Sequence, residues 1–190
     1  MTASAIMTPL GIAALKAREG VRLGAYRDSV GVPTIGYGHT KGVRLGQRIT
    51  QAEADALFLE DLASHALPIL SCIAVPVAEH ERDALISIAF NIGVGGFRAS
   101  GFLRRLNAGD RAGAAEAILA WRRPPEILSR RQAEYDQFRT PYAVALPRAR
   151  RDDARPVAVP RSPDRAPPAT AVRPGPLARL RQRIGEALRA

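Results

Sequence analysis

The stretch from Glu19 to Thr40 constrains the fold most, because it combines a helix stop, a hairpin pattern and two acids. The apolar residues before it recur at helical spacing, and Gly20 is a typical residue just past a helix C-terminus. β-Branched and aromatic residues over 23–26 and 32–37 flank the turn sequence DSVG, which predicts a small β-hairpin. We therefore expect a helix end to lie beside a hairpin.

This layout would set two carboxyls and a hydroxyl near one another, with Glu19 at the helix end, Asp28 in the turn and Thr34 on the returning strand. Hydrolysis of a glycosidic bond needs one carboxylic acid to protonate the leaving oxygen and a second carboxylate to activate water. Glu19, against an apolar wall, is the candidate for the protonated acid, and Asp28, in a polar turn, for the ionised one. Taken alone, two acids are more often solvated surface charges.

The spacing of these residues also carries a resemblance. Glu19, eight residues, Asp28, five residues and Thr34, followed at once by IGYGHT, resembles the active-site signature of the phage-type lysozymes, the endolysin family. The sequence AFNIGVGGFRASGFLRRLNAGD over 89–110 resembles the second signature of that family. Trp121 followed by SRRQAEYDQF resembles its closing helix region.

The resemblance implies an α+β, lysozyme-like fold with a small hairpin lobe, a mainly helical lobe and a cleft between them for a glycan strand. It implies Glu19 as general acid, Asp28 as the carboxylate that activates water and Thr34 as the group that positions this water. The implied reaction is hydrolysis of the β-1,4 bond between N-acetylmuramic acid and N-acetylglucosamine in peptidoglycan, with inversion at the sugar carbon, leading to cell lysis.

Three further residues are expected to support this site. The resemblance implies Arg130 as an ionic partner of Glu19, with its neighbour Arg131 as a second choice. Tyr37 and His39, within the signature, are expected to be substrate-binding or supporting residues. We interpret His39 as a structural hydrogen-bonding residue rather than a catalyst. The chain departs from the family in the compact segment RRPPEIL, so the groove is expected to differ in shape there.

Two alternatives remain open at this stage. A lytic transglycosylase cuts the same bond without water and leaves a 1,6-anhydro end, but it needs no second carboxylate, so Asp28 and Thr34 argue against it. A catalytically idle wall-binding module with an active tail belongs to another class of protein. The products of digestion and the substitution Glu19→Gln separate these alternatives.

No cofactor or metal is expected. The three histidines lie far apart, and the single cysteine, Cys72, suits a plain buried thiol. The run GVGG lacks the lysine and the preceding strand that a phosphate-binding loop requires, which excludes nucleotide binding of that type.

Helical spacing dominates after the hairpin. Thr50 and Glu53 form a capping-box pattern before a long helix that is expected to bend or stop near Pro68. A helix from Glu79 is expected to end at the glycines of GVGG, and Trp121 is expected to pack in the core rather than on sugar. The remaining helices are predicted over 100–107, 110–121 and 130–138.

The N-terminal residues show neither a signal-peptide pattern nor an apolar run long enough for a membrane span. We therefore expect the enzyme to stay in the host cytoplasm until it is released to the periplasm and cell wall. By the resemblance, a hole-forming phage protein, or holin, is the expected partner for this release. A monomer is the default expectation.

The composition changes at Pro147. Residues 147–190 hold eleven Arg, no Lys and four acids, so they carry +7 of the formal net charge of +10. We predict a catalytic domain over 1–146, a disordered Pro/Arg-rich linker over 147–175 and a cationic amphipathic helix over 176–190. The tail either binds anionic envelope material, lipopolysaccharide or wall polymers, or is a solubilising extension. Nucleic acid is a weaker candidate, because the tail has no aromatic residues to stack on bases.

Overall fold

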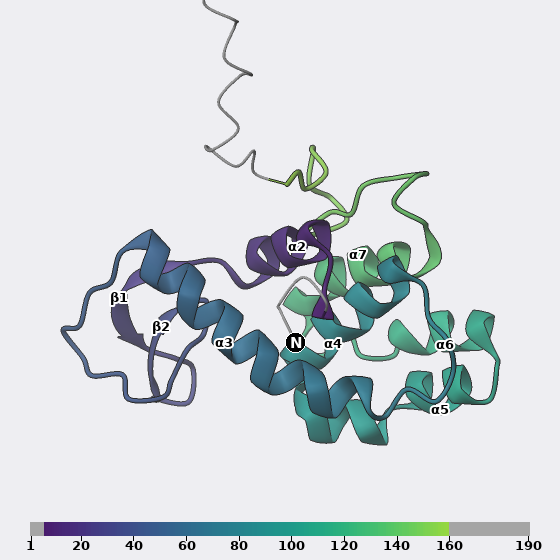
Figure 1. Ribbon diagram of the computed structural model, residues 1–190, viewed down its shortest axis with the longest axis horizontal. Coiled ribbons are helices and arrows are strands. Elements are labelled where there is room, and N and C mark those ends of the chain that lie inside the picture. Colours follow the sequence, from purple (N-terminus) through teal and green to yellow (C-terminus); the bar gives the residue numbers. More distant parts are fainter. Residues whose placement is uncertain (1–5, 160–190) are drawn as a thin grey trace, which may run out of the picture. The chain divides into compact units, whose positions relative to one another are not determined.

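The computed structural model describes residues 6–159 of the 190-residue chain, so the predictions for 160–175 and 176–190 lie outside the described residues. Helices and a two-stranded sheet make up this part (Figure 1), which confirms the predicted mixed α+β class. Its elements are α2 (Pro9–Glu19), β1 (Arg22–Arg27), β2 (Pro33–Gly36), α3 (Gln51–Leu70), α4 (Glu79–Ala99), α5 (Gly101–Asn107), α6 (Arg111–Ile118), the 3₁₀ turn η1 (Pro125–Ile127) and α7 (Leu128–Arg139).

Helix α2 ends where the sequence predicts. Its N-cap Thr8 accepts a hydrogen bond from the backbone N–H of Gly11, and Pro9 occupies the first turn. At the other end Gly20 adopts a φ of 70°, and its N–H donates to the Lys16 carbonyl at 3.0 Å. A left-handed φ costs glycine nothing, so the chain leaves the helix directly after Glu19.

The hairpin that follows is antiparallel, with Arg22 opposite Gly36, Tyr26 opposite Thr34 and an irregularity in register between these pairs. Beyond β2, an isolated antiparallel bridge joins Gly24 to Arg48. Backbone groups of β1 also donate a hydrogen bond to residues 47–49 and accept one from them. These bonds hold the loop that contains 47–49 against the hairpin.

Helix α3 connects the hairpin to the other helices (Figure 1). Its N-terminus has the predicted capping box, in which Thr50 accepts from the Glu53 backbone and Glu53 accepts from the Thr50 backbone at 2.7 Å. Pro68 lies in the last turn, and the helix ends two residues later at Leu70. Helix α3 contacts both β2 and α4, which places it between the two parts of the described structure.

Helix α4 lies at the centre of the helical part, packed against α2, α3 and α7. Gly93, with φ 76° and ψ 162°, ends its first helical segment as predicted, but Gly95 and Gly96 lie inside the next segment instead of ending the helix. Within residues 6–159 no single helix is long and apolar enough to cross a membrane; α4 and α5 meet that test only as a bent pair. The buried residues around α4 include Phe58, Leu62, Leu85, Ile86, Ile88, Ala89, Phe97 and Phe102.

Trp121 and Cys72 both lie at the edge of this core. Trp121 packs edge-on against Phe102 with a centroid distance of 6.4 Å, in keeping with a core role. Cys72 is half-buried rather than buried, and its Sγ donates to the Pro68 carbonyl and accepts from Arg98 Nε.

The structure differs from the sequence prediction just after residue 146. Pro147 was expected to begin an unordered linker, but its carbonyl accepts from the Val157 N–H at 2.7 Å, and the Arg151 N–H donates to the Ser129 carbonyl at 3.1 Å. Ala149 is buried. Hydrogen bonds and one small apolar contact hold residues 147–159 in place. The prediction of an unordered linker rests on composition, and composition does not reveal such bonds.

A close approach between α2 and α4 gives a first prediction. A Cβ atom built on Gly11 would lie 2.2 Å from Oδ2 of the fully buried Asp83, which also accepts from the Thr8 N–H and the Tyr142 hydroxyl. We expect Gly11→Ala to lower the free energy of unfolding by about 1–3 kcal/mol through overpacking. The matched control is Gly95→Ala, at an exposed helical glycine whose built Cβ meets nothing within 4 Å; a gain of about 0.5–1 kcal/mol is expected there. Urea denaturation measures both, and an unchanged stability for Gly11→Ala would contradict the close approach.

Candidate active site

Glu19, the last residue of α2, forms an ion pair with the first turn of α7. Its Oε1 accepts a hydrogen bond from Arg130 Nη2 at 2.7 Å, so the ionic partner expected from the sequence is present. The Arg130 side chain is 7% exposed, whereas that of Glu19 is 20% exposed. One oxygen of the carboxyl is therefore held from the protein side, while the group keeps access to solvent.

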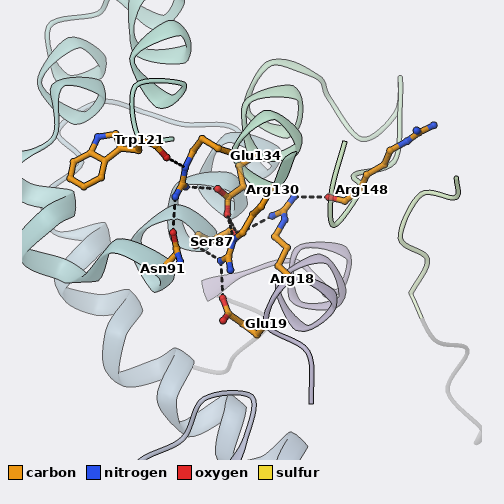
Figure 2. Close-up of polar contacts among 9 residues, drawn as sticks. Arg18, Glu19, Ser87, Asn91, Trp121, Arg130, Glu134 and Arg148 are labelled. Carbon is orange, nitrogen blue, oxygen red and sulfur yellow. Dashed lines mark hydrogen bonds and ion pairs between the residues drawn. The ribbon is translucent and has the colours of Figure 1, made fainter. Parts of the chain in front are cut away.

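Glu134 lies at the centre of the buried network behind this pair (Figure 2). Its Oε1 accepts from Arg130 Nε at 3.1 Å and from the Ser87 hydroxyl at 2.7 Å, and its Oε2 accepts from Arg131 Nη1. Arg18, next to Glu19 in the chain, donates to the Ser87 hydroxyl at 2.9 Å. These contacts join α2, α4 and α7 through charged groups that have almost no contact with water.

The charged groups of the network shift one another's pKa values. Burial by itself raises the pKa of Glu134, but the guanidinium groups of Arg130, Arg18 and Arg131 lower it below its usual value. Burial lowers the pKa of Arg18 to about 10. Burial also opposes the charge of Arg130, yet the carboxylates of Glu134 and Glu19 raise its pKa above the ordinary value. At neutral pH the network therefore contains an ionised Glu134 among charged arginines.

Most of this network could not be predicted from sequence motifs. Ser87 and Glu134 carry no motif, although the spacing of Glu134, three and four residues after two arginines, is a signal for ion pairs on one helix face. Arg131, named only as a second choice beside Glu19, pairs instead with Glu134. Arg131 also donates to the Trp121 carbonyl at 3.0 Å and to Asn91 Oδ1 at 2.7 Å.

Asp28 organises the turn of the hairpin. Its Oδ1 accepts from the backbone N–H of Val30 at 3.0 Å and of Val32 at 2.8 Å, the pattern of an Asx turn. The backbone of Asp28 closes the same turn, donating to the Val32 carbonyl at 3.0 Å. One oxygen is thus committed to the turn, and the direction of the carboxylate is fixed.

Thr34 lies on β2 and is buried, with an exposure of 3%. Its hydroxyl donates to the Val32 carbonyl at 3.0 Å. Since the hydroxyl proton is used there, the lone pairs of the oxygen remain to accept a hydrogen bond from water. The peptide groups of Val32 therefore connect Asp28 and Thr34, which the structure brings together on one hairpin.

Tyr37 and His39 attach the end of the hairpin to α3. The Tyr37 hydroxyl donates to Asp55 Oδ1 at 3.1 Å, and its ring packs edge-on against Phe58. His39 contacts Asp61 Oδ2 through Nδ1 and the Lys41 carbonyl through Nε2, both at 2.9 Å. Both ring nitrogens of His39 are engaged, which is the arrangement of a structural hydrogen-bonding residue.

Three of the hollows in the described part of the chain lie away from Glu19, Asp28 and Thr34. One, of about 250 Å³, lies between α7 and residues 140–148, and the others lie beside Pro125–Ser129 and beside His80 and Arg111. The glycan cleft remains a prediction. Residues 6–159 contain no group of three or more His, Cys, Asp or Glu side chains arranged to hold a metal ion.

Replacing the central carboxylate should destabilise the protein in a pH-dependent manner. Glu134→Gln leaves buried guanidinium groups without their counter-charge, so we expect a loss of about 3–5 kcal/mol in the free energy of unfolding at pH 7. Because the folded-state pKa of Glu134 is lowered, its contribution is fully present above the unfolded-state pKa and is lost as the pH falls through the folded-state value. Urea denaturation from pH 7 to pH 3 should show the gap to wild type closing, with the exposed Glu126→Gln as control. A gap independent of pH would contradict an ionised Glu134.

Comparisons with known proteins identify relatives of this chain. A profile of the phage lysozyme family matches residues 16–134. The endolysin of Acyrthosiphon pisum secondary endosymbiont phage 1 is 39% identical over 137 residues, covering 67% of this chain and 94% of the relative. Among solved structures, the endolysin from Escherichia coli O157:H7 phage FAHEc1 superposes with a TM-score of 0.67 at 35% identity, over 70% of this chain and 92% of that one. The muramidase domain of SpmX from Asticaccaulis excentricus gives a TM-score of 0.65 at 35% identity, over 69% and 95%. The chain therefore belongs to the phage lysozyme family and is a glycoside hydrolase of the lysozyme type.

Proposed function

We propose that this chain hydrolyses the β-1,4 bond between N-acetylmuramic acid and N-acetylglucosamine in peptidoglycan, with Glu19 as general acid. The observation that carries the proposal is the sharing of Arg130 between two carboxylates, Glu19 and Glu134. Glu134 supplies a second negative charge to Arg130. Glu19 can therefore take up a proton without leaving the buried guanidinium of Arg130 without a counter-charge. Glu19 can thus be held in place by Arg130 and still serve as a proton donor.

The hairpin would supply the water. Oδ1 of Asp28 is engaged by two backbone N–H groups, so Oδ2 is the oxygen left to accept a proton from water. Thr34, whose proton goes to the Val32 carbonyl, accepts the second hydrogen of this water through a lone pair. The water oxygen attacks the sugar carbon, its proton passes to Asp28, and the proton of Glu19 goes to the leaving oxygen, which inverts the configuration.

The second carboxylate, Asp28, favours hydrolysis over the cleavage without water that a lytic transglycosylase performs. The family name and a relative titled a muramidase domain support the same reaction. By analogy with relatives named endolysins, the biological role would be cell lysis: a monomeric enzyme, held in the host cytoplasm, reaches the wall once a holin has opened the membrane.

Product analysis with matched variants tests the reaction and the roles. Wild type should release fragments with reducing ends, as measured by mass spectrometry of digested peptidoglycan. Glu19→Gln and Asp28→Asn should each lower kcat by at least about 10²–10⁴, because each removes one proton-transfer step. Glu126→Gln, an exposed charge change of the same kind, should retain wild-type activity.

Each contrary result has a distinct meaning. Anhydro ends would identify a transglycosylase. Full activity in Glu19→Gln would show that Glu19 is not the general acid. Full activity in Asp28→Asn would show that Asp28 is not the base. Reducing ends with both variants inactive is the outcome that the proposal requires.

The charge of residues 160–190, seven Arg against two acids, leads us to propose that they attach the enzyme to anionic envelope material. We expect a chain ending at Val159 to lose activity about tenfold more on intact Gram-negative cells than on cells with a permeabilised outer membrane. A full-length variant with these seven Arg replaced by Gln controls for length and should behave like the truncation. Added salt should weaken the wild-type advantage, since screening reduces such attraction. Equal losses on both kinds of cell, or none, would contradict the proposal.

A further inference from the structure

Residues 147–153, which we call the strap, follow the region that matches the lysozyme family and yet contact Arg18 of the buried network around Glu134. We propose that the strap is a positioning element that holds the Glu19–Arg130 ion pair in its geometry. The inference rests on the proposed catalytic role of Glu19. It concerns a segment beyond the 16–134 covered by the family match.

The strap contacts the residues that immediately precede both members of the pair. The carbonyl of Arg148 accepts from Arg18 Nη2 at 2.9 Å, at the end of α2 (Figure 2). On the other side, the Arg151 N–H donates to both the carbonyl and the hydroxyl oxygen of Ser129, each at 3.1 Å, at the start of α7. Asp152 accepts from the same hydroxyl. One short segment therefore joins the side chain of the residue before Glu19 to the backbone and hydroxyl of the residue before Arg130.

Arg18 depends on this contact. Its side chain is buried, and burial lowers the pKa of the guanidinium to about 10. Nη1 donates to Ser87 and Nη2 to the strap, whereas Nε has no acceptor among residues 6–159. Loss of the Arg148 carbonyl would leave a second nitrogen of a buried cation unsatisfied, which is costly. Arg18 would then have to move, and Glu19 follows it directly in the chain.

The strap has internal bonds that give it a defined shape. The Arg148 side chain donates to the Asp153 carbonyl at 2.9 Å, and the Arg150 N–H donates to Asp153 Oδ2 at 2.8 Å. Ala149, which lies between Arg148 and Arg150 in the sequence, is buried. The carbonyl offered to Arg18 is therefore fixed by the strap itself.

A displaced proton donor reduces turnover more than it reduces substrate binding. A shift of about 1 Å at a catalytic group can cost up to about 10² in rate, because the reacting atoms leave their alignment. We expect loss of the strap to lower kcat about tenfold, to change KM by less than about twofold and to alter the pH–rate profile. A purely stabilising segment would change none of these in folded protein.

The test uses full-length chains on soluble peptidoglycan fragments, so that attachment to an envelope plays no part. In the first variant, residues 147–153 are replaced by a Gly/Ser segment of equal length; its matched control replaces 160–166 in the same way. In the second, Ser129→Ala with Asp152→Ala removes the side-chain anchor on α7. Its control is Ser64→Ala, which removes an exposed hydroxyl bonded to a carbonyl on α3. Circular dichroism melting identifies the folded variants, and kcat, KM and the pH profile are measured on those.

We expect about a tenfold loss of kcat in the first variant, about threefold in the second, and wild-type values in both controls. If the first variant does not fold, the second decides. Wild-type kcat and pH profile in a folded variant of either kind would overturn the inference. Glu19→Gln, measured in parallel, separates the two proposals: if it is active, the catalytic role of Glu19 fails, and if it is inactive while the strap variants match wild type, only the strap inference fails.

Discussion

The described structure depends on one fully buried carboxylate, Glu134, placed among three arginines. A buried guanidinium without a counter-charge is strongly unfavourable, so α2 and α7, which carry these groups, cannot separate without exposing or stranding a charge. The Ser87 hydroxyl of α4 bonds to Arg18 and to Glu134. The network thereby fixes the end of α2 against α4 and α7. Apolar packing around α4 gives the helical part its stability, but it has no comparable directional requirement.

The two halves of the candidate site are held by different means. Glu19 belongs to the charged helical network, whereas Asp28 and Thr34 are fixed by backbone hydrogen bonds inside the hairpin. Helix α3 joins the halves, because its acids accept the contacts from Tyr37 and His39 at the end of the hairpin. Substitutions in α3 can therefore act on the site without touching any of the three proposed catalytic groups.

Several features of the fold and of the candidate site could be predicted from the sequence, because their signals are local. The stop after Glu19 follows from a glycine, the turn at Asp28 from Asx chemistry and the start of α3 from a capping box, and each signal lies within a few residues. The centre at Glu134 was not predictable in this way, since its bond to Ser87 joins residues 47 positions apart. The contact from Arg18 to Arg148 was also missed, because a backbone carbonyl has no sequence signature.

The peptide groups of Val32 serve two residues of the candidate site: its N–H donates to Asp28 Oδ1 and its carbonyl accepts from the Thr34 hydroxyl, while the residue is 40% exposed. Pro33 follows it and disfavours helical torsion angles at Val32, which helps to keep that peptide in an extended shape. The side chain at position 32 is thus free to vary, provided that an N–H remains. Proline alone among the twenty amino acids would remove it, so natural or directed diversification can change the surface of the hairpin tip here while the chemistry beneath stays intact.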